Sequence, residues 1–86
     1  MRGWRADPAV VDLIELAGQW LAGEAWPQAV QACERLHGRL DPADPEQAEF
    51  GEALAAYLAE LRGVGDAPAA EDSRRLQHRF RRLVRG

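Results

Sequence analysis

The amino-acid sequence predicts an all-α fold, a small four-helix bundle made of two antiparallel helical hairpins. Four stretches of the 86-residue chain carry apolar side chains at every third or fourth position, which is the period of a helix with one buried face. No stretch alternates polar and apolar residues as a half-buried strand does, and β-branched residues are few, with five Val, one Ile and no Thr. Short connections between the first three helices predict that neighbouring helices run antiparallel.

Proline marks the starts of the first two helices. In the pair Asp7-Pro8, the aspartate can cap a helix N-terminus and the proline fits the first helical position, which predicts a helix over residues 8–22. Pro27 opens the next apolar stripe, which predicts a second helix over residues 26–38.

The second half of the chain predicts a matching hairpin. The pair Asp44-Pro45 opens a helix predicted over residues 45–62, whose apolar side chains form one continuous stripe. Residues 63–68 combine glycine and proline with little side-chain bulk, so they predict a loop or hinge. A fourth, amphipathic helix is predicted over residues 69–84. The sequence leaves open whether this last helix packs in the core or swings free on the loop.

The chain is long enough for one small domain, residues 1–86, because compact domains usually contain about 100 to 150 residues. Its composition is 47% hydrophobic, but sixteen of these residues are Ala, so the core is expected to be thin. A single cysteine excludes an intramolecular disulfide. Domains of this size are commonly stabilised by a partner chain or by self-association. We therefore expect an apolar helical surface that stays incompletely covered until a partner docks.

Charge is distributed unevenly along the chain, although the net charge is only −3. Six of the eleven arginines lie in residues 74–86, whereas residues 1–73 hold the other five and all fourteen acidic residues. The arginines of the last helix lie opposite its apolar stripe. They either face water and the acidic helices, or they contact nucleic-acid phosphates, an anionic membrane or an acidic partner. Sequence-specific DNA binding is not expected, because Gln77 is the one amide side chain in this helix that could read a base.

An offset of 34 residues relates the two halves of the chain. The related segments are Asp7-Pro8 with Asp41-Pro42, Glu15-Leu16-Ala17 with Glu49-Phe50-Gly51, and Trp20 with Leu54. Residues 8–42 resemble a tetratricopeptide repeat, which has this length. In the first helix of the repeat, Leu16-Ala17 resembles the family's Leu-Gly pair and Trp20 resembles the aromatic residue one turn later. In the second helix, Trp26 and Ala29 resemble the family's aromatic and small residues, and Pro42 lies near the position of the closing proline. It implies a scaffold that binds peptides or partner helices in a groove, without catalysis.

Side chains for catalysis or metal binding are scarce. Lys, Asn and Thr are absent, and Ser and Tyr each occur once. Cys33 and His37 lie one helical turn apart and could form part of a zinc site or a nucleophile–base pair. Two ligands are too few for zinc, and no oxyanion-hole loop or glycine-rich turn accompanies the pair. We therefore expect no enzyme activity, no metal site and no cofactor.

The chain is expected to be cytoplasmic and to have no transmembrane segment. Asp7, Asp12 and Glu15 interrupt the N-terminal region too early for a signal segment. The longest uncharged run, residues 25–33, is much shorter than the roughly 20 residues that a transmembrane helix needs. The lone Cys33 is compatible with a reducing compartment.

Together these features predict a non-catalytic protein-binding module, such as an adaptor, a subunit of a larger assembly or a small inhibitor-type protein. Its partner is expected to be another protein or a second copy of the chain, docked on an apolar helical surface. The alternative is a binder of nucleic acid or anionic membrane through the arginine-rich helix. The predicted partner-binding residues are of the types most common in interface hot spots: Trp4, Trp20, Trp26, Arg75, Arg79 and Arg82.

Overall fold

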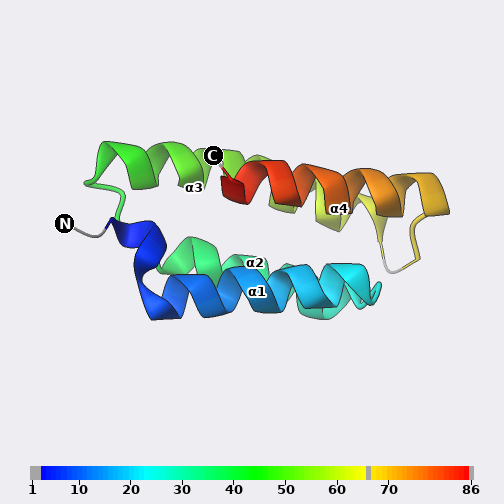
Figure 1. Cartoon of the computed structure of the whole chain (residues 1–86). Coiled ribbons are helices and arrows are strands. Elements are labelled where there is room, and N and C mark those ends of the chain that lie inside the picture. The colour runs from blue at the N-terminus through cyan, green and yellow to red at the C-terminus, as the bar shows by residue number, and fades with distance from the viewer. Residues whose placement is uncertain (1–2, 66, 86) are drawn as a thin grey trace.

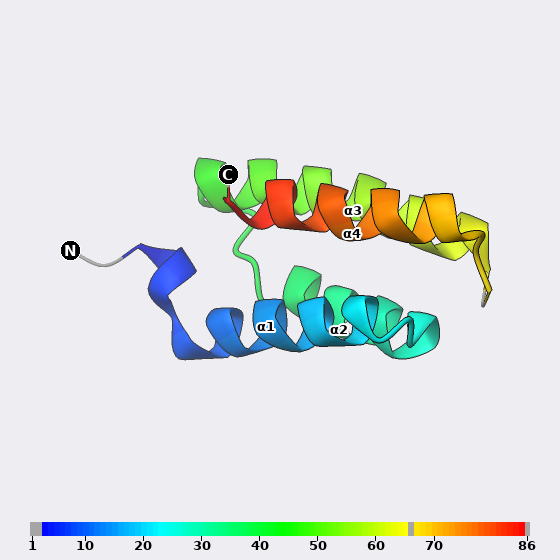
Figure 2. The same cartoon turned by 45° about the vertical axis from the view of Figure 1, so that its right-hand side comes forward.

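The computed structural model describes residues 3–65 and 67–85 and confirms the all-α fold. A short 3-10 helix precedes four α-helices, with these bounds: η1 (Trp4–Ala6), α1 (Pro8–Ala22), α2 (Trp26–Gly38), α3 (Pro45–Val64) and α4 (Ala70–Arg85). The hairpin of α1 and α2 forms one layer and the hairpin of α3 and α4 forms the other (Figure 1), and a second view shows the same two layers (Figure 2). Contacts of α2 with α3 and of α1 with α4 join the layers into a four-helix bundle of 41 × 20 × 19 Å.

Helices α1 and α3 begin at the predicted Asp-Pro pairs. The Asp7 carboxylate accepts a hydrogen bond from the Ala9 N–H at 3.0 Å, and the Asp44 carboxylate accepts one from the Glu46 N–H at 3.2 Å. Each aspartate thus satisfies a backbone N–H that has no acceptor inside its helix. These local contacts fix where the first helix of each hairpin starts.

Helix α3 is two residues longer than predicted, because it ends at Val64 rather than at residue 62. The Val64 side chain packs against the core, and this contact holds the extra half-turn in place. Gly65 then adopts a positive φ of 74°, a region that favours glycine because a side chain would be strained there. The predicted loop therefore begins at Gly65 instead of residue 63, and residue 66 within it lies outside the described residues.

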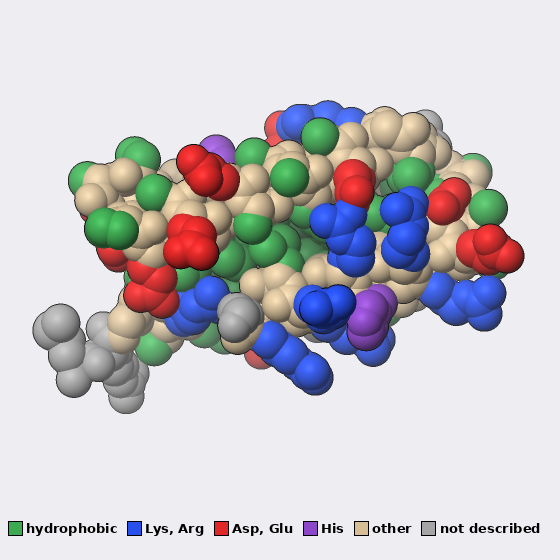
Figure 3. Space-filling model, turned by 90° about the horizontal axis from the view of Figure 1, so that it is seen from above, with side chains coloured by type: hydrophobic (Ala, Val, Ile, Leu, Met, Phe, Trp, Pro, Cys, Tyr) green, Lys and Arg blue, Asp and Glu red, His purple; other side chains and the backbone are tan. Residues whose placement is uncertain are grey.

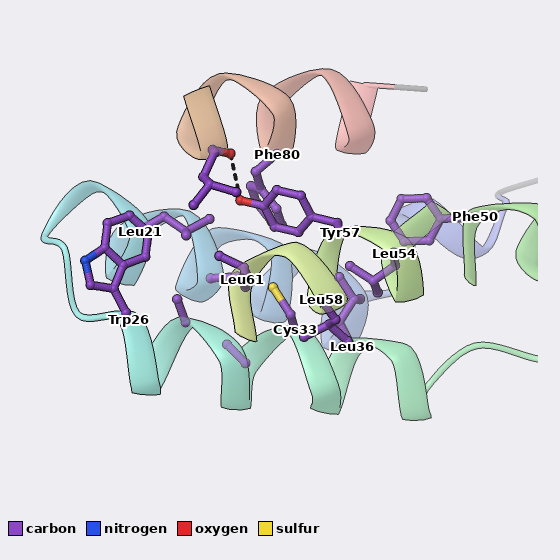
Figure 4. Packing of buried hydrophobic residues seen from close by; sticks show 14 of the residues in the cluster. Leu21, Trp26, Cys33, Leu36, Phe50, Leu54, Tyr57, Leu58, Leu61 and Phe80 are labelled. Carbon is purple, nitrogen blue, oxygen red and sulfur yellow. Dashed lines mark hydrogen bonds between the residues drawn. The ribbon is translucent and has the colours of Figure 1, made fainter. Parts of the chain in front are cut away.

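The hydrophobic core is one cluster to which all four α-helices contribute (Figure 4). Its largest fully buried side chains are Tyr57, Leu21, Leu36, Leu54, Leu61, Leu76 and Cys33. The Tyr57 hydroxyl donates a 2.7 Å hydrogen bond to the Leu76 carbonyl, and the Tyr57 ring centre lies 5.7 Å from that of Phe80. Helix α4 is therefore packed in the core and is not a free arm.

Burial of Cys33 predicts a loss of stability at alkaline pH. The pKa of its thiol is raised from an ordinary 9.0 to about 12, first by burial and second by the neighbouring Glu34 carboxylate. Burial also raises the pKa of Tyr57. The unfolded chain releases the thiol proton near pH 9, whereas the folded chain retains it. This contribution to stability is therefore fully present below pH 9 and is lost between pH 9 and pH 12.

Urea unfolding at a series of pH values, followed by circular dichroism, measures this loss. Cys33→Ala removes the thiol, so the variant should lose less stability over that pH range than the wild-type chain, even though it is less stable at neutral pH. A wild-type free energy of unfolding that stays constant between pH 9 and pH 12 would contradict the prediction.

Candidate binding surface

A groove runs between α3 and α4 on the face of the bundle that Figure 3 shows. Two adjoining hollows of about 380 and 360 Å³ form it, and both are lined by Ala53, Arg82 and Leu83. Phe50 lines the first hollow and Tyr57 lines the second. Because the hollows share walls, they form one continuous surface, the α3–α4 groove.

Alanines on α3 explain why the groove is open. Ala53 and Ala56 are exposed on the edge of α3 that faces α4, and their methyl groups are too short to reach across. Phe50 and Tyr57 lie on the buried side of the same stretch of helix. The groove thus has small apolar walls above aromatic rings, a surface that can accept apolar side chains from outside.

The two edges of the groove carry opposite charges at helical spacing. The acidic edge on α3 consists of Glu46, Glu49 and Glu60, and the basic edge on α4 consists of Arg75, Arg79 and Arg82. An ion pair between Arg79 and Glu60 crosses the groove, and Arg75 pairs with Asp72 of its own helix at 3.1 Å. Glu49 and Arg82 line the groove without an ion-pair partner among the described residues.

The N-terminal helix η1 closes one end of the groove. Arg5 Nη1 donates a 2.8 Å hydrogen bond to the Val84 carbonyl, one of the last carbonyls of α4, which lack helical partners. The Arg5 guanidinium lies 4.9 Å from the ring centre of Trp4 and 5.2 Å from that of Phe50, within cation–π distance. Arg5 Nε also lies 3.9 Å from Glu46 Oε1. This set of contacts, the η1 clasp, ties the start of the chain to the C-terminal end of α4.

The structure places the three tryptophans that were predicted to bind a partner in different environments. Trp26 is 3% exposed and packs in the core (Figure 4), and it borders a separate hollow of about 360 Å³ between α2 and the end of α3. Trp4 packs on Phe50 with ring centres 5.1 Å apart, and its Nε1 is buried without a hydrogen-bond partner among the described residues, so its ring forms part of the η1 clasp. Trp20 is 37% exposed, although its spacing placed it on the buried stripe, and it lies on α1 in the layer opposite the α3–α4 groove.

The predicted arginines share one edge of α4, but the structure also shows a second row of basic side chains on this helix. The outward row lies opposite Leu76 and Phe80 and consists of Arg74, His78, Arg81 and Arg85. All four side chains are exposed, and none has an ion-pair partner within the part of the chain that the structure describes. The sequence predicted basic side chains opposite the apolar stripe, but it did not divide them into a row that borders α3 and a row that faces away from the bundle.

Cys33 and His37 differ in their environments. Cys33 is fully buried with a pKa of about 12, so its thiol stays protonated at neutral pH. His37 is exposed and lines a separate hollow of about 480 Å³ between the end of α2 and the start of α3. Within residues 3–65 and 67–85, no group of three or more His, Cys, Asp or Glu side chains could hold a metal ion. None of the described helices is long and apolar enough to cross a bilayer.

No protein-family model matches the chain, and comparisons with curated proteins and with solved structures find no match either. The resemblance of residues 8–42 to a tetratricopeptide repeat therefore stays a prediction. Fold and surface define the chain as a small all-α bundle with an apolar groove between two edges of opposite charge.

Removing the η1 clasp is expected to destabilise the bundle. Arg5→Ala deletes the hydrogen bond to the Val84 carbonyl and the contact with two aromatic rings, at an expected cost of about 1–2 kcal/mol. Urea unfolding measures this cost. Arg35→Ala is the matched control, because Arg35 is exposed on α2 and has no ion-pair partner among the described residues. Equal free energies of unfolding for the two variants would show that the clasp contributes nothing.

Proposed function

We propose that this chain is a non-catalytic protein-binding module that receives a helical segment of a partner polypeptide in its α3–α4 groove. The observation that supports the proposal is the combination of an apolar floor with two edges of opposite charge. An adaptor, a subunit of an assembly and a small inhibitor-type protein would all use such a surface in the same way.

The groove has the length of about three turns of a partner helix. Its lining residues on α3 run from Glu46 to Tyr57, about 16 Å at the rise of an α-helix. Apolar side chains of the partner, spaced three or four residues apart, would cover Phe50 and Leu83. Removing this apolar surface from water supplies affinity, at about 25 cal/mol for each Å² buried.

The charged edges set the direction of the bound segment. Arg82 offers a planar guanidinium to a carboxylate, and Glu49 on the opposite edge offers a carboxylate to a basic side chain. A partner helix with an acidic flank and a basic flank satisfies both groups in only one orientation. Charge thus selects orientation, and the apolar floor supplies most of the binding energy.

The proposal includes no catalytic step. Cys33, the candidate nucleophile, is buried in the core and protonated at neutral pH, so it does not reach a substrate. A free buried thiol is compatible with a reducing compartment, which supports the cytoplasm as the proposed location.

Filling the groove is expected to weaken partner binding. Ala53→Trp places a large ring over the floor, whereas Ala59→Trp adds the same ring at an exposed position of α3 outside the groove. Helical peptides selected from a library against the wild-type chain serve as probes, and NMR chemical-shift changes locate them. The selected peptides should bind Ala53→Trp at least about tenfold more weakly and bind Ala59→Trp with unchanged affinity. Peptides that shift signals elsewhere, or that bind both variants equally, would refute the proposal.

A second candidate function is binding to an anionic surface through the outward row of α4. The exposure of these four basic side chains, without ion-pair partners among the described residues, favours it. Leu76 and Phe80 on the apolar face of α4 are buried in the core, so contact with a membrane would be electrostatic and without insertion.

Retention on heparin and on vesicles that contain phosphatidylserine measures this second function. The wild-type chain is expected to be retained at low salt and released as salt is raised. The test variant, which should not be retained, replaces three arginines of the outward row with Gln: Arg74, Arg81 and Arg85. The control removes the same charge elsewhere, by replacing Arg35 on α2, Arg39 directly after α2 and Arg62 on α3 with Gln. Similar retention of the two variants would exclude the outward row as the contact surface.

A further inference from the structure

We infer that the α3–α4 groove recognises a partner segment in which an aromatic residue is followed directly by arginine, and that η1 occupies this part of the groove in the free chain. The inference rests on the proposed function and adds the chemistry of the partner. The occupied part, the η1 site, consists of Glu46, Phe50 and the Val84 carbonyl. Figure 1 shows η1 at the end of the bundle where α3 begins and α4 ends.

The side chains of η1 make the contacts that a bound peptide would make. The Trp4 ring centre lies 5.1 Å from that of Phe50, so Trp4 covers part of the groove floor. The Arg5 guanidinium lies 5.2 Å from the centre of the same ring, and its Nε lies 3.9 Å from Glu46 Oε1 on the acidic edge. Arg5 Nη1 donates a 2.8 Å hydrogen bond to the Val84 carbonyl, and Arg5 also lines the first hollow of the groove. The η1 site thus accepts a flat apolar ring and, beside it, a planar cation.

Arginine suits the η1 site better than any other charged residue. One guanidinium reaches an aromatic ring, a carboxylate and a backbone carbonyl together, because its N–H groups lie in one plane and point in different directions. The ammonium group of lysine is a compact charge that cannot stack flat on a ring. An acidic side chain would meet the Glu46 carboxylate and the negative end of the α4 dipole. Charge therefore selects arginine after the ring.

Few contacts hold η1 in its site. The segment has three residues, and none of them is fully buried. Within the described chain, the backbone hydrogen bonds of η1 are local. The Ala6 N–H donates to the Gly3 carbonyl at 3.0 Å, and the Asp7 N–H donates to the Trp4 carbonyl at 3.1 Å. Trp4 Nε1 is buried without a hydrogen-bond partner among the described residues, which weakens the seating of its ring.

Helix η1 can leave the site without unwinding α1. The Asp7 side chain caps α1 by accepting a hydrogen bond from the Ala9 N–H, and this cap does not involve η1. Because η1 is tethered to α1, its effective concentration at the site is at least about millimolar. A partner segment can overcome this advantage, because its further apolar side chains cover Ala53 and Leu83, which η1 leaves open. Partner binding then releases Trp4 and Arg5 from the groove.

A dipeptide probe tests the inference. The double variant Trp4→Ala/Arg5→Ala empties the η1 site in the full chain, and it should keep the four α-helices because neither side chain belongs to the fully buried core. N-Acetyl-Trp-Arg-amide, titrated into the isotope-labelled double variant, should bind with millimolar affinity and shift the NMR signals of Phe50 and Val84. The wild-type chain should bind this probe at least about tenfold more weakly, because η1 already fills the site.

Matched probes and variants serve as controls. N-Acetyl-Trp-Glu-amide reverses the charge of the probe and should bind the double variant at least about tenfold more weakly. Glu46→Gln, added to the double variant, should weaken binding of the Trp-Arg probe about threefold. Glu52→Gln makes the same change at an exposed position on the α2 side of α3 and should leave binding unchanged.

A second variant covers a loss of folding. If circular dichroism shows that the double variant has lost its helices, the single variant Trp4→Ala takes its place. This variant vacates the aromatic half of the η1 site, so the ring of the Trp-Arg probe should still shift the Phe50 signals.

The failures of the inference and of the proposed function are distinguishable. Equal binding of the Trp-Arg probe to the wild-type chain and the double variant would overturn the inference. So would equal binding of the two probes to the double variant, or no binding of either. These outcomes leave the proposed function standing, because Ala53→Trp tests the groove with peptides of any sequence. If the Trp-Arg probe binds as expected but the selected peptides lie elsewhere, the proposed function fails. The η1 site then serves only the chain's own N-terminal segment, and the inference fails with the proposed function.

Discussion

Burial of the apolar stripe of α4 is the constraint on which the rest of the structure depends. Leu76 and Phe80 are the large side chains of α4 that are buried, and the Tyr57 hydroxyl fixes the helix through the Leu76 carbonyl. Most other residues of α4 are polar or charged, so these contacts determine how the helix is rotated. With Leu76 and Phe80 turned inward, one set of arginines borders α3 and another faces away from the bundle. The groove and the outward row are thus two results of one packing event.

Local signals in the sequence predicted most of the fold because each acts within a few residues. The aspartates Asp7 and Asp44 cap their helices as expected, and the apolar period identified all four helices. The end of α3 was not predicted, because Val64 is held by a contact with the core that the local sequence does not encode. Trp20 and Trp26 also show that the local sequence does not encode contacts between the hairpins. Both fall on apolar stripes, but the way in which the hairpins pack decides which flank of a stripe is covered.

The candidate site could be predicted only in part. Arg75, Arg79 and Arg82 were chosen for their residue type, and their helical spacing places them along one edge of α4. The floor was not identified, because Ala53 looks like an ordinary helix-forming residue until α4 lies beside it. The pairing of Arg79 with Glu60 joins residues 19 apart on different helices, so the sequence could not show which arginine stays unpaired. The binding function itself stays a prediction.

The thin core has a different consequence from the one that composition suggested. Among the described residues, the exposed large hydrophobic side chains are Val11 and Trp20, so α3 and α4 do not present a broad apolar strip. The accessible apolar surface between them is a narrow groove walled by alanines, and it can supply only a modest binding energy. Selectivity must then come from the charged edges, which lie in solvent and are screened over about 8 Å at physiological salt. Because of this screening, the charged edges act only on a partner that is already in contact with the groove. The spacing of charges along a partner helix therefore affects selectivity more than the net charge of the helix does.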